Sequence, residues 1–115
     1  MSNQTILVTG GAGHVGSHLV ELLASDPTKR VISLDNYFNG SEDNHVPGAE
    51  YRRGHTKDIE TLVPETPDVI YHLGEYARIT PSFEDAALVY DMNISGTFAV
   101  VEYCRRRRVP KLVYA

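Results

Sequence analysis

A cluster of glycines directly after a short apolar run constrains the fold more than any other feature of this chain. The glycines are Gly10, Gly11, Gly13 and Gly16, and the run before them is residues 5–9. Read from Gly11 the spacing is G-x-G-x-x-G, and read from Gly10 it is G-x-x-G-x-x-G. Because glycine has no Cβ, such a cluster lets a strand turn sharply and lets backbone N–H groups approach a ligand. Apolar residues recur at helical spacing over residues 15–24, so we expect strand, turn and helix in succession.

An acidic residue follows this turn at the distance typical of a dinucleotide-binding unit. The start of the helix would offer unpaired N–H groups and the positive end of its dipole to a pyrophosphate. Asp35 ends the next apolar run about 20 positions beyond Gly16, where a carboxylate accepts hydrogen bonds from a ribose 2′-hydroxyl and repels a 2′-phosphate. No arginine directly follows Asp35, so we expect NAD rather than NADP. The alternative is that Asp35 only starts a turn into Asn36.

Apolar runs rich in Val and Ile recur along the chain, which is typical of strands that are covered on both faces. We expect five strands, at residues 5–9, 31–35, 49–53, 68–73 and 111–115. Helical stretches lie between them, so the pattern predicts an α/β fold: a doubly wound, Rossmann-type parallel sheet in the order 3-2-1-4-5, with helices on both faces. We expect one domain over residues 1–115, with no linker and no repeat.

Two segments between the strands give more particular expectations. Ser82 and Asp85 resemble a capping box, from which a long helix is expected to run from about residue 83 to residue 107. The loop 36–47 is rich in Asn, Gly and Asp, and we expect it to be the least ordered part of the chain.

Composition narrows the range of partners. The chain has 15 acidic and 11 basic residues, which disfavours sequence-independent binding to nucleic acid. Its one cysteine, Cys104, cannot form an internal disulfide, so we expect a reducing, cytoplasmic location. No apolar stretch approaches the roughly 20 residues of a membrane span, so no membrane association is expected.

Five short segments, distributed over the whole chain, form a more specific pattern. They are the glycine turn T-G-G-A-G-H-V-G-S-H-L, Asp35-Asn36, His72-Leu73-Gly74, Asn93-Ile94-Ser95-Gly96-Thr97 and Val113-Tyr114-Ala115. In order and spacing they resemble the extended short-chain dehydrogenase/reductase family, in its NAD-dependent nucleotide-sugar epimerase/dehydratase branch, similar to UDP-glucose 4-epimerases. The resemblance implies that NAD is bound by Gly10, Gly11, Gly13, His14, Val15, Gly16, Asp35, Asn36, Leu73, Gly74 and Asn93. It also implies that Glu75, Arg78 and Ser82 lie toward the substrate, a nucleotide sugar.

Two positions depart from that family. His14 stands where Phe or Tyr is commoner, and the segment Gly54-His55-Thr56-Lys57-Asp58 stands where G-D-I-x-D is frequent. His55 therefore replaces an acid at the position that the resemblance assigns to the adenine.

The family's catalytic groups are a Ser or Thr directly after V-Y-A and a Tyr-x-x-x-Lys beyond it, in which Tyr is the general base. The chain ends before all three, so we expect no catalytic residue within it. We interpret the chain as the amino-terminal portion of such an enzyme, without the substrate domain, and we expect it to be inactive alone.

The resemblance implies epimerisation of a UDP-hexose by transient oxidation and reduction at C4. A dehydratase or reductase of the same family, or a non-catalytic NAD-binding fragment, remain as alternatives. The family also often dimerises through the long helix, and an uncovered edge on the last strand is a second place where a copy could pair.

Four other features have simpler interpretations. His14 and His18 are spaced as a metal pair would be, but no third ligand accompanies them, so no metal site is expected. The four arginines at 105–108 favour the end of a helix rather than a nucleic-acid patch. Cys104 is expected to pack rather than react, and His72 to be structural rather than catalytic.

Overall fold

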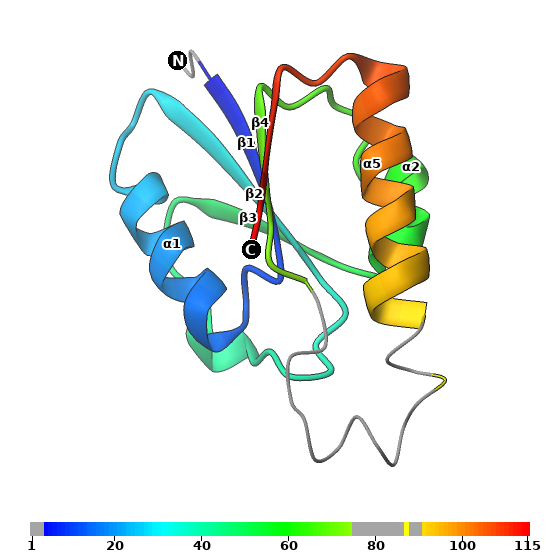
Figure 1. The fold of residues 1–115 in the computed structure, drawn as a ribbon. Helices are drawn as coiled ribbons and strands as arrows, with labels where there is room; N and C mark the ends of the chain where they lie inside the picture. The colour runs from blue at the N-terminus through cyan, green and yellow to red at the C-terminus, as the bar shows by residue number, and fades with distance from the viewer. Residues whose placement is uncertain (1–3, 75–86, 88–90) are drawn as a thin grey trace.

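The computed structural model describes residues 4–74, 87 and 91–115, which form a five-stranded parallel sheet (Figure 1). Its strands are β1 (Gln4–Thr9), β2 (Lys29–Asp35), β3 (Ala49–Arg53), β4 (Val69–His72) and β5 (Lys111–Tyr114). The strands lie in the order β3-β2-β1-β4-β5, and every neighbouring pair is parallel. The predicted fold class and the predicted strand order 3-2-1-4-5 are confirmed.

Helices cover both faces of this sheet, with α1 (His14–Ala24) on one side and α2 (Ile59–Leu62) and α5 (Gly96–Arg107) on the other (Figure 1). The side chains of β1 alternate between the two faces of the sheet, which explains why the strands are continuous apolar runs in the sequence. Ile6 and Val8 pack in the core under α1, while Leu7 between them packs in the core under α2 and α5. Because successive side chains of a strand point to opposite faces, a sheet with two buried faces needs apolar residues at nearly every position.

The segments between the strands differ in detail from the expectation. Helix α1 begins at His14, one residue earlier than predicted, and two short helices that the sequence did not predict, η2 (Thr56–Asp58) and α2, connect β3 to β4. Before α5 the chain forms a π-helical turn, η3 (Asp91–Ser95). The predicted capping box at Ser82 and Asp85 lies outside the described residues, so it stays a prediction.

The loop 36–47, which was expected to be the least ordered part of the chain, is hydrogen-bonded to the glycine turn. It contains a short 3₁₀ helix, η1 (Glu42–Asn44), whose N-cap is Ser41. The backbone N–H of Ser41 and the side-chain amide of Asn44 both donate to the carbonyl oxygen of Ala12, at 3.0 and 2.8 Å. The expectation rested on composition, which does not reveal such contacts between distant residues.

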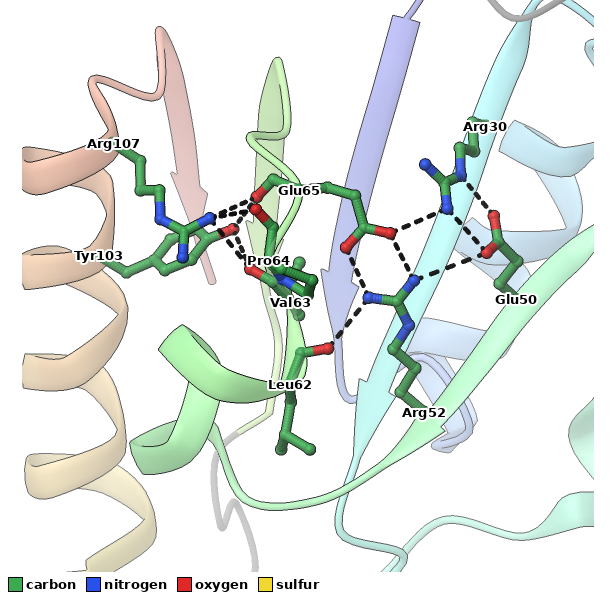
Figure 2. Close-up of polar contacts among 9 residues, drawn as sticks. All are labelled: Arg30, Glu50, Arg52, Leu62, Val63, Pro64, Glu65, Tyr103 and Arg107. Carbon is green, nitrogen blue, oxygen red and sulfur yellow. Dashed lines mark hydrogen bonds and ion pairs between the residues drawn. The ribbon is translucent and has the colours of Figure 1, made fainter.

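The arginines near residue 107 occupy the last turn of α5, as predicted, and one of them has a further role. Arg107 donates hydrogen bonds to the backbone carbonyls of Val63, Pro64 and Glu65, and the hydroxyl of Tyr103 also hydrogen-bonds the carbonyls of Val63 and Glu65 (Figure 2). These bonds fix the segment before β4 against α5. Within the described residues, no helix has the length and apolar character that crossing a membrane requires.

Candidate functional site

A cavity of about 330 Å³ opens where the carboxyl ends of β1, β2 and β4 meet. Nine residues that the sequence predicted for a cofactor line it: Gly10, Gly13, His14, Val15, Gly16, Asp35, Asn36, Leu73 and Gly74. Gly11 and Asn93 were also predicted but are not among the lining residues. The three residues predicted for the substrate, Glu75, Arg78 and Ser82, lie outside the described part of the chain. In an open parallel sheet, the carboxyl edge where the strand order reverses is the usual place for a ligand.

Six further lining residues were not assigned to the site from the sequence. They are Leu34, Asn39, Gly40, Gly54, His55 and Thr56. His55 had been noted as a departure from the family, but Asn39 and Gly40 had been treated only as part of a loop. In the sequence they form an Asn-Gly pair shortly after Asp35, the acid that ends β2. Such a pair indicates a turn, but it does not by itself indicate a ligand-binding site.

Two glycines give the turn after β1 its shape. Gly10 has a φ of +75°, and a Cβ built on it would lie 2.9 Å from the carbonyl oxygen of Leu73. A Cβ on Gly16 would overlap the carbonyl oxygen of Gly10, so the first turn of α1 can lie this close to the loop only without a side chain. A larger residue at either position would occupy the space beside the glycine turn or push the turn away from the neighbouring backbone.

The start of α1 leaves backbone donors beside the cavity. Ser17 donates its N–H to the carbonyl of Gly13, but the N–H groups of His14, Val15 and Gly16 have no acceptor within residues 4–74 or 91–115. All three residues line the cavity. Free N–H groups and the positive end of the helix dipole together favour an anion such as a pyrophosphate.

Asp35 lines the cavity and is held by two backbone hydrogen bonds. The residue is 8% exposed, Oδ2 accepts a hydrogen bond from the N–H of Ala12 at 3.0 Å, and Oδ1 accepts one from the N–H of Tyr37 at 2.8 Å. The second bond is the turn that the alternative interpretation of Asp35 predicted, so the residue both forms a turn and lines the cavity. Each carboxylate oxygen has more than one lone pair, and the carboxylate therefore keeps capacity to accept from ribose hydroxyls.

The ends of β1 and β4 are joined by side chains. His72 is fully buried, and its ring nitrogens lie 2.6 Å from Oγ1 of Thr9 and 2.9 Å from Oγ1 of Thr97. Thr9 Oγ1 also accepts hydrogen bonds from the N–H groups of Leu73 and Gly74. Burial and these contacts support the predicted structural role of His72.

His55 changes the chemistry of the cavity wall near β3. Its Nδ1 accepts a hydrogen bond from the N–H of Lys57 at 3.0 Å, so the neutral ring carries its proton on Nε2. Nε2 lies 3.1 Å from Oδ2 of Asp91, but the geometry is not that of a directed hydrogen bond, and this nitrogen has no hydrogen-bond partner in the described part of the chain. His55 thus lines the cavity where the family resemblance places an acid, with its Nε2 buried beside Asp91.

Two other features of the sequence are Cys104 and the pair His14 and His18. Burial raises the pKa of the Cys104 thiol, which disfavours the thiolate and supports the predicted packing role. The rings of His14 and His18 lie edge to face with centroids 5.6 Å apart, and no group of three or more metal-binding side chains occurs among the described residues.

The parallel sheet, the glycine turn after β1 and the buried acid after β2 together define a dinucleotide-binding α/β domain. Residues 6–115 match the model of the NAD dependent epimerase/dehydratase family, and the chain belongs to this family. The resemblance stated from the sequence is thereby confirmed, and so is NAD as the family's cofactor. The cavity fits NAD, since its glycine turn leaves room for a pyrophosphate and the carboxylate of Asp35 can accept hydrogen bonds from a ribose.

Two relatives match nearly the whole chain, and a third matches about two thirds of it. A putative UDP-glucose 4-epimerase of Methanocaldococcus jannaschii is 34% identical over 96% of this chain and 37% of its own length. The structure of Thermus thermophilus UDP-glucose 4-epimerase in complex with NAD superposes with a TM-score of 0.84 at 34% identity, over 94% of this chain and 36% of that one. UDP-glucuronic acid decarboxylase 6 of Arabidopsis thaliana is 60% identical over 63% of this chain and 22% of its own length. The chain thus spans little more than a third of the first of these relatives.

Proposed function

We propose that this chain binds NAD and forms the cofactor-binding part of a nucleotide-sugar epimerase that acts on a UDP-hexose at C4. The observation that carries the proposal is that the glycine turn and the buried Asp35 line one cavity. The relatives that are UDP-glucose 4-epimerases support the substrate class. NAD bound there would supply the hydride acceptor for oxidation of the sugar and the donor for its reduction.

The residues of this chain would bind and orient the cofactor. The N–H groups of His14, Val15 and Gly16 would donate to the pyrophosphate, and Asp35 would accept from the adenosine ribose. The Leu73–Gly74 backbone would line the other side. Asn93 and, on the sugar side, Glu75, Arg78 and Ser82 keep the roles that the family resemblance implies, as part of this proposal. The chain itself holds no Tyr-x-x-x-Lys segment to act as the general base.

A decarboxylase is the second candidate, because the Arabidopsis relative has the highest identity of the three. The two activities share a first step, the removal of hydride from C4. In a UDP-sugar that carries a carboxylate on C5, the C4 ketone is β to that carboxylate, so loss of CO₂ becomes possible before the ketone is reduced. A dehydratase or reductase would use the same cofactor site. Contacts to the sugar, rather than to NAD, distinguish these reactions.

Two measurements test the proposal. Calorimetry on the 115-residue chain should show binding of NAD in preference to NADP, and the absence of NAD binding would overturn the proposal. The protein as its gene encodes it should convert UDP-glucose to UDP-galactose, whereas release of CO₂ from UDP-glucuronic acid would favour the decarboxylase. Turnover by the 115-residue chain alone would contradict the expectation that catalysis needs the Ser or Thr and the Tyr-x-x-x-Lys.

We also propose that copies of the chain associate and that the protein is cytoplasmic. The exposed apolar side chains of Phe98 and Val101 on α5 support association through the long helix, and β5 forms one edge of the described sheet. A strand edge with unpaired N–H and C=O groups is the other place where a second copy could pair. The single cysteine supports a reducing compartment.

A further inference from the structure

Asn39 and Gly40 form the only Asn-Gly pair in the sequence, and both residues line the cavity. An asparagine followed by glycine loses its side-chain amide more readily than one followed by a larger residue, because no side chain hinders attack by the next backbone nitrogen. The pair lies between β2 and η1, outside any helix or strand. The regular hydrogen bonding that would restrain the backbone is therefore missing at this point of the loop.

The side chain of Asn39 is less restrained than those of the two other asparagines in the same loop. Oδ1 of Asn36 accepts a hydrogen bond from a backbone N–H at 3.0 Å, and Nδ2 of Asn44 donates to a carbonyl oxygen of the glycine turn at 2.8 Å. Both of these asparagines also precede a residue with a large ring. Asn39 is exposed, and within the described residues neither its carboxamide nor the N–H of Gly40 has a hydrogen-bond partner.

We propose that Asn39 is a site of spontaneous deamidation, which alters the cofactor cavity by adding a carboxylate to it. The backbone nitrogen of Gly40 attacks Cγ of Asn39, and the new N–Cγ bond forms as the Cγ–Nδ2 bond breaks. Nδ2 leaves as ammonia and carries away the proton of the attacking N–H. Water then opens the cyclic imide at either carbonyl, which gives aspartate or, where the chain runs on through Cγ, isoaspartate.

Both products should weaken cofactor binding, and this consequence rests on the proposed binding of NAD. Each replaces a neutral side chain by a negative charge in the cavity that Asp35 already lines, and the pyrophosphate is itself anionic. Isoaspartate also lengthens the backbone directly before Gly40. A Cβ on Gly40 would lie 2.9 Å from Oδ2 of Asp35 and 3.1 Å from the carbonyl oxygen of Ala12, so Gly40 cannot shift toward them.

The first test needs no cofactor. The 115-residue chain is kept in mildly alkaline buffer, which favours the attacking form of the amide nitrogen, and is then digested with trypsin. Cleavage after Arg30 and Arg52 leaves all three asparagines of the loop in one peptide. We expect mass spectrometry to show exchange of NH₂ for OH at Asn39, with Asn36 and Asn44 intact as internal controls. An unchanged Asn39, or equal loss at all three positions, would overturn the proposal.

The second test measures the effect on the cavity by calorimetry. The incubated protein should bind NAD with a Kd about tenfold higher than the fresh protein, and Asn39→Asp should match it without incubation. Asn39→Gln is the matched control, because the larger ring that glutamine must form closes more slowly. The Kd of this variant should be the same before and after incubation.

NAD present during the incubation should slow the reaction at Asn39 severalfold, because a bound dinucleotide would cover the cavity. Equal affinity of fresh and fully deamidated protein would overturn the proposed effect on the site. Absence of NAD binding by the fresh protein would instead defeat the proposed function, while the mass-spectrometric result would still decide whether Asn39 deamidates. The two failures are therefore distinguishable.

Discussion

Glu65 and Arg52 form a bidentate ion pair that joins β3 to the segment before β4. Nη1 of Arg52 lies 2.7 Å from Oε1 of Glu65, and Nη2 lies 2.6 Å from Oε2 (Figure 2). Arg30 on β2 adds a third contact to the same carboxylate at 2.9 Å. The hydrogen bonds from Arg52 hold the pKa of Glu65 at about 2, well below its ordinary value of 4.5, although burial acts in the opposite direction.

This ion pair predicts how stability depends on pH. Because the pKa of Glu65 is lower in the folded than in the unfolded chain, its ionisation stabilises the fold fully above pH 4.5, and this contribution is lost as the pH falls toward 2. Glu65→Gln should lower the free energy of unfolding at neutral pH by about 1–2 kcal/mol and flatten its pH dependence in that window. Urea denaturation at a series of pH values measures both effects.

Glu102→Gln is the matched control for that experiment. Glu102 pairs with Arg105, whose side chain is 68% exposed, and solvent screens a pair of this kind so that it contributes little. Its substitution should change the unfolding curve much less than Glu65→Gln does. If Glu65→Gln keeps the acid dependence of the unsubstituted protein, the assignment of that dependence to Glu65 is wrong.

Gly16→Ala should destabilise the chain and weaken NAD binding. Alanine normally stabilises a helix relative to glycine by about 1 kcal/mol, so the sign of the effect is informative. Here the added Cβ would overlap the carbonyl oxygen of Gly10, and we expect a loss of about 1–3 kcal/mol in the free energy of unfolding. The Kd for NAD should rise at least about tenfold, because the glycine turn and the first turn of α1 must move apart to make room for the Cβ. Glu21→Ala, on the exposed face of the same helix, should change neither quantity, and a stabilised Gly16→Ala protein would contradict the close approach.

Asp35→Asn tests the origin of NAD selectivity. The carboxylate accepts from the N–H groups of Ala12 and Tyr37, one at each oxygen, so an amide must aim its NH₂ at one of these donors. We expect the Kd for NAD to rise about tenfold or more through loss of a charge-assisted acceptor, while the preference for NAD over NADP shrinks. Calorimetry with both dinucleotides measures this, with Asp43→Asn in the exposed part of the adjoining loop as control. Equal affinity before and after substitution would remove Asp35 from the site.

Patterns within single segments predicted the sheet and much of the cavity. Apolar runs such as Val69–His72 are visible without knowing their neighbours, and the strand order follows from the doubly wound pattern that the glycine turn indicates. The glycine turn and Asp35 were found because their roles depend on spacing along the chain, which a sequence displays directly.

Contacts between distant segments account for what the sequence did not predict. The left-handed Tyr37, with a φ of 62°, the attachment of Ser41 to Ala12 and the ion pair of Glu65 each need a partner that no local pattern identifies. The four-residue helix α2 is likewise too short for helical spacing to reveal. Such features are decided by tertiary packing rather than by local propensity.

The exposed face of α5 provides the last prediction, which concerns association. Phe98 and Val101 are 67% and 47% exposed, and their i, i+3 spacing places them on one side of the helix. If two copies meet through this face, Phe98→Glu should shift sedimentation velocity toward the monomer, because a pair of buried like charges opposes contact. Leu22→Glu, at an equally exposed apolar position on α1, is the control and should leave association unchanged. Association that survives Phe98→Glu would exclude this face and leave the edge of β5 as the place where copies pair.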